Sequence, residues 1–305
     1  MTFDGLKKFK LSPQLYFFVL VIFLLVFYSV FKTDGQIDSQ NNTAVVIDSI
    51  EAPIEDSMDL LGRAELSYDG GTEGRHKNIE LGIARINGTI LQPGEEFSFK
   101  KELGAVTVED GFSEEKIFLN GEVTKGVGGG LCQVSTVLFR TAMASALPIT
   151  ERASHSFTVS RYDEGLDATY SDPGPDFKFK NDTANPILIK GKTENLSAIF
   201  EIYGTKDGRV ASSSPVAISN IKDILPTKYV WVPKLEEGQA KCINAPQIGF
   251  TAKMKYDIIY SDGKVNEKEF VSRYKPLQRI CYIVGDEIKT FDITKIKINN
   301  IEDGF

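Results

Sequence analysis

Gly128-Gly129-Gly130-Leu131-Cys132-Gln133-Val134-Ser135-Thr136 is the stretch that sets the architecture of this chain. The apolar run from Leu131 to Leu147 carries one charge, at Arg140, and contains neither Gly nor Pro before Pro148. This pattern predicts a buried helix whose first turn holds Cys132. Because a helix N-terminus carries positive partial charge and free N–H groups, we expect the pKa of the Cys132 thiol to be lowered there.

The residues beside the cysteine are candidates for contact with a substrate. Glycines allow the backbone to approach a ligand closely, so Gly128, Gly129 and Gly130 are predicted to bind substrate. Gln133 could supply an oxyanion contact, as could the backbone N–H of Cys132. The glycine run is not a phosphate-binding P-loop, because no Gly-Lys-Ser/Thr sequence follows it.

His155 is the expected partner of Cys132. The alternation in His155 to Ser160 predicts a strand with His155 on the same face as Phe157 and Val159, and that apolar face should turn toward the helix of Cys132. A Cys–His pair transfers acyl groups by thiolate attack, with the histidine acting first as base and then as acid. The alternative is a hydrogen-bonded core histidine without a catalytic role.

A third residue is needed to orient the imidazole. Asp167, Asp176 and Asn181 are candidates, and we assign the role to Asp167; the alternative for each is hydrogen bonding in a turn or at a strand end. Arg152 and Arg161 could bind a carboxylate, such as a peptide terminus, in bidentate fashion, so Arg152 is predicted to bind substrate. Surface salt bridging is the alternative for both arginines.

Short motifs stand in order on both sides of the cysteine, at Asn78-Ile79, Ile86 to Leu91, Pro93-Gly94-Glu95, Phe97-Ser98-Phe99, Glu151-Arg152, His155-Ser156, Asp167-Ala168-Thr169, Asp176 to Asn181 and Asn185-Pro186-Ile187. Together with the cysteine motif they resemble the VanW-like family, and the resemblance runs from about Leu61 to about Lys190. The family takes its name from an accessory protein of glycopeptide (vancomycin) resistance operons, so the resemblance implies a context at the cell wall.

The overall composition is that of a globular protein. Hydrophobic residues make up 42% of the 305 residues and charged residues 25%, and the formal net charge is −7. This acidic balance argues against nucleic acid as a partner, because nucleic-acid binding calls for a basic patch. The three cysteines and two histidines show no metal-ligand spacing, so neither a metal nor a cofactor is expected.

The N-terminal segment predicts a membrane anchor. Leu11 to Phe31 contain no charge and are long enough for a helix to cross a bilayer. Lys7, Lys8 and Lys10 precede the run, which places the N-terminus in the cytoplasm and the bulk of the chain outside the cell membrane. A cleaved signal peptide is the alternative, but the run is too long for a usual signal and no Ala-x-Ala site follows it.

An exported chain with an odd number of cysteines leaves at least one thiol free. The simplest assignment is a disulfide between Cys242 and Cys281, with Cys132 free. Three unpaired buried cysteines are the alternative.

The fold class expected is α+β, with one central helix packed on an antiparallel sheet, followed by a small extended all-β domain and preceded by the transmembrane helix. Asn120-Gly121 signals a hairpin, and Thr193-Glu194-Asn195 joins two further strands. Tyr229 to Gly285 resembles a G5 domain, with an unrelated small β domain as the alternative. The predicted parts are 1–32 cytoplasmic tip and transmembrane anchor, 33–58 flexible stalk, 59–205 VanW-like domain, 206–228 linker, 229–286 G5-like β domain and 287–305 C-terminal tail.

Two functions fit these features. The first is a Cys/His thiol enzyme, a peptidase or transpeptidase, acting on peptidoglycan peptides or their precursors. The second is a non-catalytic envelope module that binds peptidoglycan or a partner, with the Gly-Gly-Gly-Leu-Cys motif maintaining the fold. An anchor, a stalk and a wall-binding β module are expected under both.

Overall fold

The computed structural model describes residues 58–119, 122–235, 240–284 and 301–302. Pro53–Phe305 form one compact unit, which is mostly β and has three helices in the described ranges. The predicted anchor (1–32) and all but the last residue of the predicted stalk (33–58) lie outside the described residues. In the part of the chain that is described, no helix has the length and apolarity needed to cross a bilayer.

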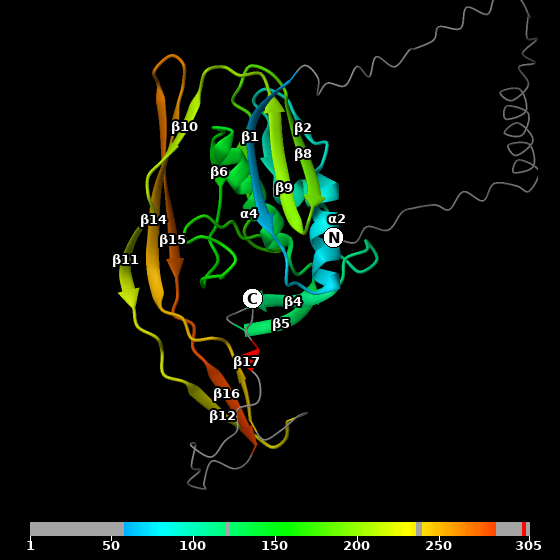
Figure 1. Cartoon of the computed structure of the whole chain (residues 1–305), viewed down its shortest axis with the longest axis vertical. Coiled ribbons are helices and arrows are strands. Elements are labelled where there is room, and N and C mark those ends of the chain that lie inside the picture. Colours follow the sequence, from blue (N-terminus) through cyan, green and yellow to red (C-terminus); the bar gives the residue numbers. More distant parts are fainter. Residues whose placement is uncertain (1–57, 120–121, 236–239, 285–300, 303–305) are drawn as a thin grey trace, which may run out of the picture. The chain divides into compact units, whose positions relative to one another are not determined.

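The main sheet is antiparallel and carries two helices, with strands in the order β1-β9-β8-β2 (Figure 1). Helix α4 packs on β1 and β9, and α2 packs on β8 and on α4. This is the arrangement predicted for a central helix on an antiparallel sheet. The elements are β1 (Asp59–Ser67), α2 (Glu73–Ile86), β2 (Ile90–Leu91), α4 (Leu131–Ala144), β8 (Ile187–Glu194) and β9 (Ser197–Gly204).

Local signals explain these elements. Thr72 caps α2, because its side chain accepts a hydrogen bond from the backbone N–H of Arg75. Helix α4 is buried along most of its length, as the apolar run requires. The turn between β8 and β9 places Asn195 and Leu196 at positive φ, a conformation that matches the twist of a two-residue hairpin.

Two smaller sheets flank the main sheet. In β4–β5 the pairing of Leu119 with Glu122 confirms the predicted hairpin, whose two turn residues lie outside the described ranges. The other small sheet has the strand order β3-β7-β6. Within it the rings of Phe97 and Phe179 stack with their centroids 4.8 Å apart. The elements are β3 (Glu96–Ser98), α3 (Phe99–Leu103), β4 (Glu114–Leu119), β5 (Glu122–Val127), β6 (Ile149–Glu151) and β7 (Lys178–Lys180).

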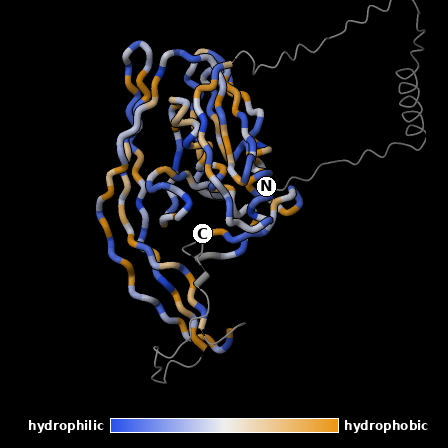
Figure 2. The backbone as a smooth tube through the Cα atoms, viewed as in Figure 1, coloured by the Kyte–Doolittle hydropathy of each residue, from blue (hydrophilic) through white to orange (hydrophobic). Residues whose placement is uncertain are grey.

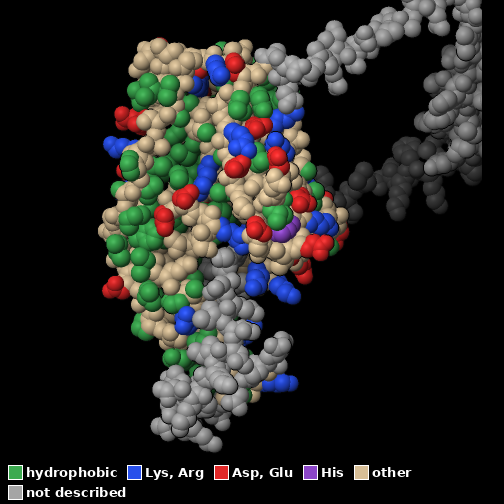
Figure 3. All heavy atoms as spheres, in the orientation of Figure 1, with side chains coloured by type: hydrophobic (Ala, Val, Ile, Leu, Met, Phe, Trp, Pro, Cys, Tyr) green, Lys and Arg blue, Asp and Glu red, His purple; other side chains and the backbone are tan. Residues whose placement is uncertain are grey.

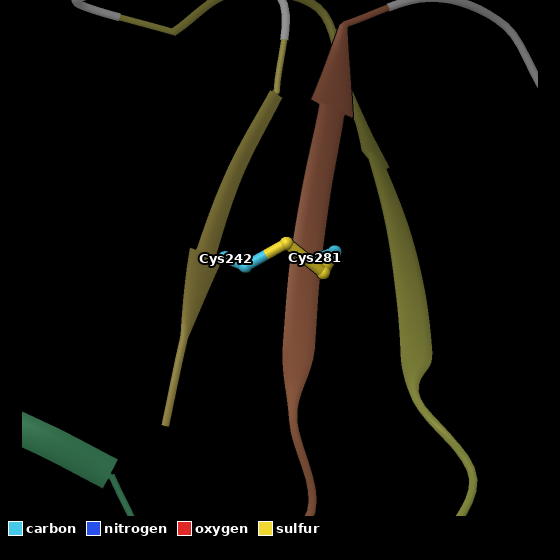
Figure 4. Close-up of a disulfide and its surroundings, with 2 residues drawn as sticks. All are labelled: Cys242 and Cys281. Atoms are coloured by element: carbon cyan, nitrogen blue, oxygen red, sulfur yellow. A yellow bond between two sulfur atoms is a disulfide. The ribbon is translucent and has the colours of Figure 1, made fainter. Parts of the chain in front are cut away.

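The C-terminal part is a set of long strands in two sheets. One has the order β10-β14-β11, with β15 also paired to β14, and the other has the order β12-β16-β13-β17. The elements are β10 (Val210–Ser213), β11 (Ala217–Lys222), β12 (Lys228–Val232), β13 (Ala240–Ile243), β14 (Gly249–Ile259), β15 (Val265–Tyr274), β16 (Ile280–Val284) and β17 (Ile301–Glu302). Cys242 on β13 and Cys281 on β16 are joined by a disulfide, and Cys132 is free (Figure 4).

The predicted linker 206–228 is wrong, because this segment contributes β10 and β11, both hydrogen-bonded to β14. The prediction failed because these strands are short and polar, so pairing with β14 rather than their own pattern makes them strands. The β10–β11–β14–β15 sheet also exposes apolar side chains, including Val210, Ile218 and Val265. Figure 3 shows hydrophobic side chains on the surface along this side of the molecule. The resemblance of residues 229–286 to a G5 domain stays a prediction.

One hydrophobic core spans both predicted domains. Met254, Tyr256 and Phe270 of β14 and β15 belong to the same buried cluster as Phe139 of α4. The Phe270 and Phe139 rings meet edge to face with centroids 5.4 Å apart. Figure 2 shows hydrophobic stretches of chain along these strands. The C-terminal strands therefore help to build the core beneath the cysteine motif and do not form a separate core.

Candidate active site

Cys132 lies in the first turn of α4, as the sequence predicts. The helix begins after Gly130, whose φ of 110° is open to glycine and strained for other residues, and Gly130 makes no side-chain cap. Gly128 also has a positive φ, of 87°. These two backbone angles turn the chain sharply from β5 into the helix and place the sulfur at its start.

The glycines do not have the ligand-facing role that we predicted. Gly128 and Gly129 are buried, and a Cβ on Gly129 would lie 2.7 Å from the carbonyl oxygen of Lys116. A Cβ on Gly130 would lie 3.1 Å from Arg75 Cγ and from Ile79 Cγ1. The close approach that the glycines permit is therefore to strand β4 and helix α2 of the protein itself.

The segment Asp167 to Tyr170 lies directly against the start of α4. Cys132 Sγ is 3.5 Å from Thr169 Oγ1, 3.4 Å from the Tyr170 carbonyl oxygen and 3.5 Å from the Tyr170 backbone nitrogen. One turn later, Thr136 Oγ1 accepts a hydrogen bond of 3.0 Å from the Ala168 backbone N–H. The hydroxyl of Ser135 donates to the Ala168 carbonyl oxygen. Residues at this helical spacing share one face, so the motif after Cys132 holds this segment in place.

His155 lies in a loop and not in the strand that we predicted. Its backbone N–H donates to Asp167 Oδ2 at 2.7 Å, and Ser156 accepts a 2.7 Å hydrogen bond from the backbone N–H of Lys275. These bonds go to a carboxylate and to a distant turn, so the segment has no neighbouring strand with which to form a ladder. The side chain nevertheless turns inward: it is 17% exposed, and it lies close enough to Cys132 for the two groups to shift each other's pKa.

Asp167 is the third residue of the group. Its Oδ2 is 2.6 Å from His155 Nδ1, and its side chain is 3% exposed. The other oxygen, Oδ1, accepts hydrogen bonds from Arg152 Nη2 at 3.1 Å and from the Tyr274 hydroxyl at 2.6 Å. Every oxygen of this buried carboxylate is thus paired, which is what a charge in a protein interior requires.

Arg152 supports Asp167 and does not face a substrate, which corrects our prediction. Its side chain is 2% exposed. It donates to the Asp167 carbonyl oxygen at 2.6 Å, to the Gly165 carbonyl oxygen at 3.0 Å and to Ser272 Oγ at 2.8 Å. The guanidinium also lies 5.4 Å from the centroid of the Phe139 ring. Burial and these partners leave it no surface for a ligand.

Strand β15 supplies two of these contacts, from Ser272 and Tyr274. The Tyr274 hydroxyl accepts a 2.8 Å hydrogen bond from the Gly165 backbone N–H while it donates to Asp167. Nothing in the sequence indicates this role, since Tyr274 lies 107 residues beyond Asp167 in an ordinary alternating strand. Only the pairing of β15 with β14 brings it beneath the loop that carries Asp167 and His155.

The charges of the three residues are coupled. Burial by itself raises the pKa of the Cys132 thiol, but the hydrogen bond and charge of His155 outweigh burial, so this pKa lies below its ordinary value. Burial would lower the pKa of His155, yet its hydrogen bonds with Asp167 and Cys132 raise it to about 10. Burial would raise the pKa of Asp167, but the hydrogen bond and charge of His155 lower it to about 2. The three shifts run in the directions that favour a thiolate, an imidazolium and a carboxylate side by side.

Gln133 points away from this group. Its carboxamide oxygen accepts from Arg75 Nη2 at 2.5 Å, and its nitrogen donates to the Ser67 carbonyl oxygen at 2.7 Å. The residue is completely buried. The prediction that Gln133 contacts an oxyanion is therefore wrong, because its side chain ties α4 to α2 and to the end of β1.

The two other candidates for the third residue have structural roles. Asp176 accepts hydrogen bonds from Ser98 Oγ at 2.6 Å and from the Lys100 backbone N–H at 2.9 Å, at the start of α3. Asn181 donates to the carbonyl oxygens of Leu91 and Asn185, both at 2.9 Å. Both are the turn and strand-end hydrogen bonds that formed the alternative reading of these residues.

A pocket of about 350 Å³ lies elsewhere, at the C-terminal end of α4. It is lined by residues such as Leu61, Ser145 and Arg209. Cys132 is at the opposite end of this 14-residue helix, about 18 Å away at 1.5 Å per residue. Across the described ranges, no group of three or more His, Cys, Asp or Glu side chains is placed to hold a metal ion.

Comparison with known proteins finds a family model that covers the site. Residues 74–203 match the family model described as VanW like protein. This range contains Cys132, Arg152, His155 and Asp167 and excludes Ser272 and Tyr274. The chain is similar to "Uncharacterized protein YoaR" of Bacillus subtilis (strain 168), with 33% identity over 191 residues, 63% of this chain and 57% of the relative.

A second relative carries a functional name. "Vancomycin B-type resistance protein VanW" of Enterococcus faecalis (strain ATCC 700802 / V583) is 34% identical over 134 residues, 42% of this chain and 49% of the relative. The chain thus spans about half the length of the curated relatives that it matches.

Proposed function

We propose that this protein, whose residues 74–203 match the VanW-like family model, is a cysteine-dependent acyl-transfer enzyme of the cell envelope. Its substrates would be peptidoglycan stem peptides or their precursors, and its reaction hydrolysis or transpeptidation. The observation that carries the proposal is the group of Cys132, His155 and Asp167, with a lowered thiol pKa beside a raised imidazole pKa. A thiolate poised beside an imidazolium is the arrangement used in nucleophilic catalysis by cysteine.

The reaction divides into two steps. The Cys132 thiolate attacks the carbonyl carbon of a peptide bond, and His155 gives its proton to the departing amine, leaving a thioester on the sulfur. In the second step, water or an acceptor amine attacks the thioester while neutral His155 takes a proton from it. The thioester bond breaks, and Cys132 leaves as the thiolate. The backbone N–H of Cys132, in the first helical turn, is the candidate donor to the oxyanion. Asp167 keeps the imidazole oriented and stabilises its charge.

Envelope location and wall substrates belong to the proposal. They are supported by the name of the Enterococcus relative and by the uncharged run from Leu11 to Phe31, which would anchor the chain in the membrane. The acidic net charge fits a partner other than nucleic acid. A G5-like module at 229–286 would add contact with wall polymer.

The alternative is a non-catalytic envelope module. One observation favours it: the sulfur is flanked by both the N–H and the carbonyl oxygen of Tyr170, and Cys132 is partly buried. In that case the cysteine and histidine would pack the loop 152–170 onto α4, and the protein would bind peptidoglycan or a partner without changing it.

Turnover and binding assays separate the two functions. The full-length protein, Cys132→Ala and the matched control Tyr256→Phe would be incubated with synthetic stem peptides, followed by mass spectrometry of peptides and protein. We expect new products and an acyl adduct on Cys132 in the wild type and in Tyr256→Phe, and neither in Cys132→Ala. Equal peptide binding by wild type and Cys132→Ala, with no product and no adduct from either, would show that the module is not an enzyme.

A further inference from the structure

Two arginines lie beside the Cys132–His155 pair and take no part in holding Asp167. Arg75, in the first turn of α2, packs against Gly130, and its charge interacts with Cys132 and with Arg161. Arg161 follows His155 in the same loop, and its charge also acts on Tyr162. The Tyr162 ring lies 5.5 Å from the His155 ring. Both guanidinium groups are therefore neighbours of the reactive group.

Each guanidinium donates a hydrogen bond from one nitrogen and has another nitrogen that is buried without an acceptor among the described residues. Arg75 Nη2 donates to Gln133 at 2.5 Å, and Arg161 Nη1 donates to the Asp69 carbonyl oxygen at 2.9 Å. Arg75 Nη1 and Arg161 Nε are buried and have no hydrogen-bond partner among the residues that the structure describes. Within the same residues, neither guanidinium is in ion-pair distance of a carboxylate.

A third nitrogen lies at the same place. His76 Nε2 is also buried and has no hydrogen-bond partner in the described part of the chain. A Cβ placed on Gly71 would be 3.0 Å from His76 Nε2 and 3.1 Å from Arg75 Nη1, so these two atoms adjoin one point. Arg161 reaches the same turn through its bond to Asp69. Arg75 Nη1 and His76 Nε2 thus adjoin the turn 69–71, and the guanidinium of Arg161 is bound to the same turn.

The chemistry of this cluster favours an anion. Leaving a buried donor without an acceptor is costly, and two unpaired guanidinium groups repel each other. Burial and the charge of Arg161 lower the pKa of Arg75, and together they outweigh the opposing charges of Tyr162, Glu115 and Cys132, so a bound anion would stabilise the charged guanidinium. Guanidinium groups match the planar geometry of a carboxylate, so one carboxylate would satisfy donors from both arginines.

We propose that Arg75 and Arg161, with His76, form a carboxylate-binding subsite beside Cys132 that holds a free carboxylate of the peptide substrate. The assignment rests on the proposed acyl-transfer function for its substrate and on the donor cluster for its chemistry. It restricts the substrates to peptides with a free carboxylate, at the chain terminus or on a side chain, close to the bond that reacts.

Alkylation of Cys132 tests the subsite without requiring turnover, because Cys132 is the free thiol. Iodoacetate and iodoacetamide differ in the carboxylate, so the ratio of their rates reports anion recognition. In the full-length protein we expect this ratio to fall about tenfold in Arg75→Gln and in Arg161→Gln, the effect of losing a hydrogen bond to a charged group. The iodoacetamide rate of each variant should stay within about twofold of the wild-type rate, and this result would also show that the variants fold.

The matched control is Lys77→Gln, which removes one positive charge from an exposed position on the same helix. It should keep the wild-type ratio. An unchanged ratio of the iodoacetate rate to the iodoacetamide rate in both arginine variants would overturn the subsite. An equal fall of this ratio in Lys77→Gln would also overturn it, because the effect would then come from net charge alone.

Direct binding gives a second readout that needs no reactive thiol. Isothermal titration with acetyl-Ala-Ala, with its carboxamide and with inorganic phosphate would compare the anions. We expect the free carboxylate to bind at least tenfold more tightly than the amide, and this preference to vanish in Arg161→Gln. Tighter binding of phosphate than of the carboxylate peptide would overturn the assignment to carboxylate. If the preference is seen but no peptide is turned over, the subsite stands and the enzyme does not.

Discussion

At the scale of single residues, Asp167 links the parts of the site. Its two oxygens pair with His155 on one side and with Arg152 and Tyr274 on the other, and the carboxylate is almost fully buried. A buried charge is stable only when its partners are fixed. The orientation of the imidazole therefore depends on residues that never approach the sulfur.

Tyr274→Phe should expose this dependence. The change keeps the ring but removes the donor to Asp167 and the acceptor of the Gly165 N–H. We expect the free energy of unfolding to fall by about 1–3 kcal/mol, the cost of an unsatisfied buried group. The thiol pKa of Cys132 should also rise, because a loosened Asp167 holds the imidazolium less well. Denaturant unfolding and the pH dependence of alkylation measure the two effects.

The control is Tyr256→Phe, which loses hydrogen bonds to the carbonyl oxygens of Met143 and Leu147 at the far end of α4. It should lose stability but keep the alkylation profile. If both tyrosine variants shift the profile alike, Tyr274 has a general structural role and does not position Asp167.

At the scale of elements, the junction between β5 and α4 fixes where the sulfur lies. Gly130 combines a φ of 110° with side-chain neighbours at 3.1 Å, whereas Gly88 has a φ of 88° with no atom within 4 Å of an added Cβ. At both positions the positive φ would strain a residue that has a side chain. Of the two, only Gly130 would also bring that side chain against neighbouring atoms.

Gly130→Ala should therefore destabilise the protein more than Gly88→Ala does. Left-handed backbone costs an alanine about 1–2 kcal/mol, so we expect a loss of that size for Gly88→Ala and a larger one for Gly130→Ala. Gly130→Ala should also slow alkylation of Cys132, since α2 and α4 must move apart. Equal losses of stability in thermal unfolding, with unchanged thiol reactivity, would contradict this account of the motif.

The elements that could be predicted from the sequence are those specified by local pattern. The apolar run gave the α4 helix, and Asn120-Gly121 gave the β4–β5 hairpin. The loop carrying His155 could not be predicted, because its hydrogen bonds go to distant partners. Thr158 Oγ1, for instance, donates to the Gln247 side chain at 2.6 Å. A short alternation of apolar residues is not evidence of a strand when no partner strand is available.

The site was predictable in its chemistry but not in its supporting contacts. Cysteine and histidine chemistry pointed to Cys132, His155 and Asp167, and the structure brings these three together. Arg152 was misread as ligand-facing because sequence shows its charge and hides its burial. Tyr274 could not be found at all, since a tyrosine in an alternating strand carries no sign of what its hydroxyl contacts.

At the scale of the whole molecule, the C-terminal strands and residues 74–203, which match the VanW-like family model, share a core. Phe270 of β15 packs edge to face on Phe139 of α4, and Arg152 lies 5.9 Å from the Phe270 ring. The residues outside the family match are thus part of what positions the site. Unfolding of these strands should disturb Cys132.

Phe270→Ala tests this shared core. We expect the free energy of unfolding to fall by about 3–5 kcal/mol, as for other buried aromatic truncations. Circular dichroism and accessibility of Cys132 to alkylation should report one common transition. Val265→Ala, at a half-exposed position of the same strand, should change stability by no more than about 0.5 kcal/mol. Two separate transitions, with Cys132 protected through the first, would show independent domains.

The pH dependence of Cys132 alkylation by iodoacetamide, in wild type and in His155→Gln, tests the central claim most directly. Since the thiol pKa is lowered and the His155 pKa is raised to about 10, the wild-type rate should rise at a lower pH than for the same thiol in denaturant. In His155→Gln the cation is lost but burial remains, so the thiol pKa should exceed the ordinary value of about 8.5 and the rate at pH 7 should fall more than tenfold. Identical profiles for wild type, His155→Gln and the denatured chain would contradict a thiolate–imidazolium pair.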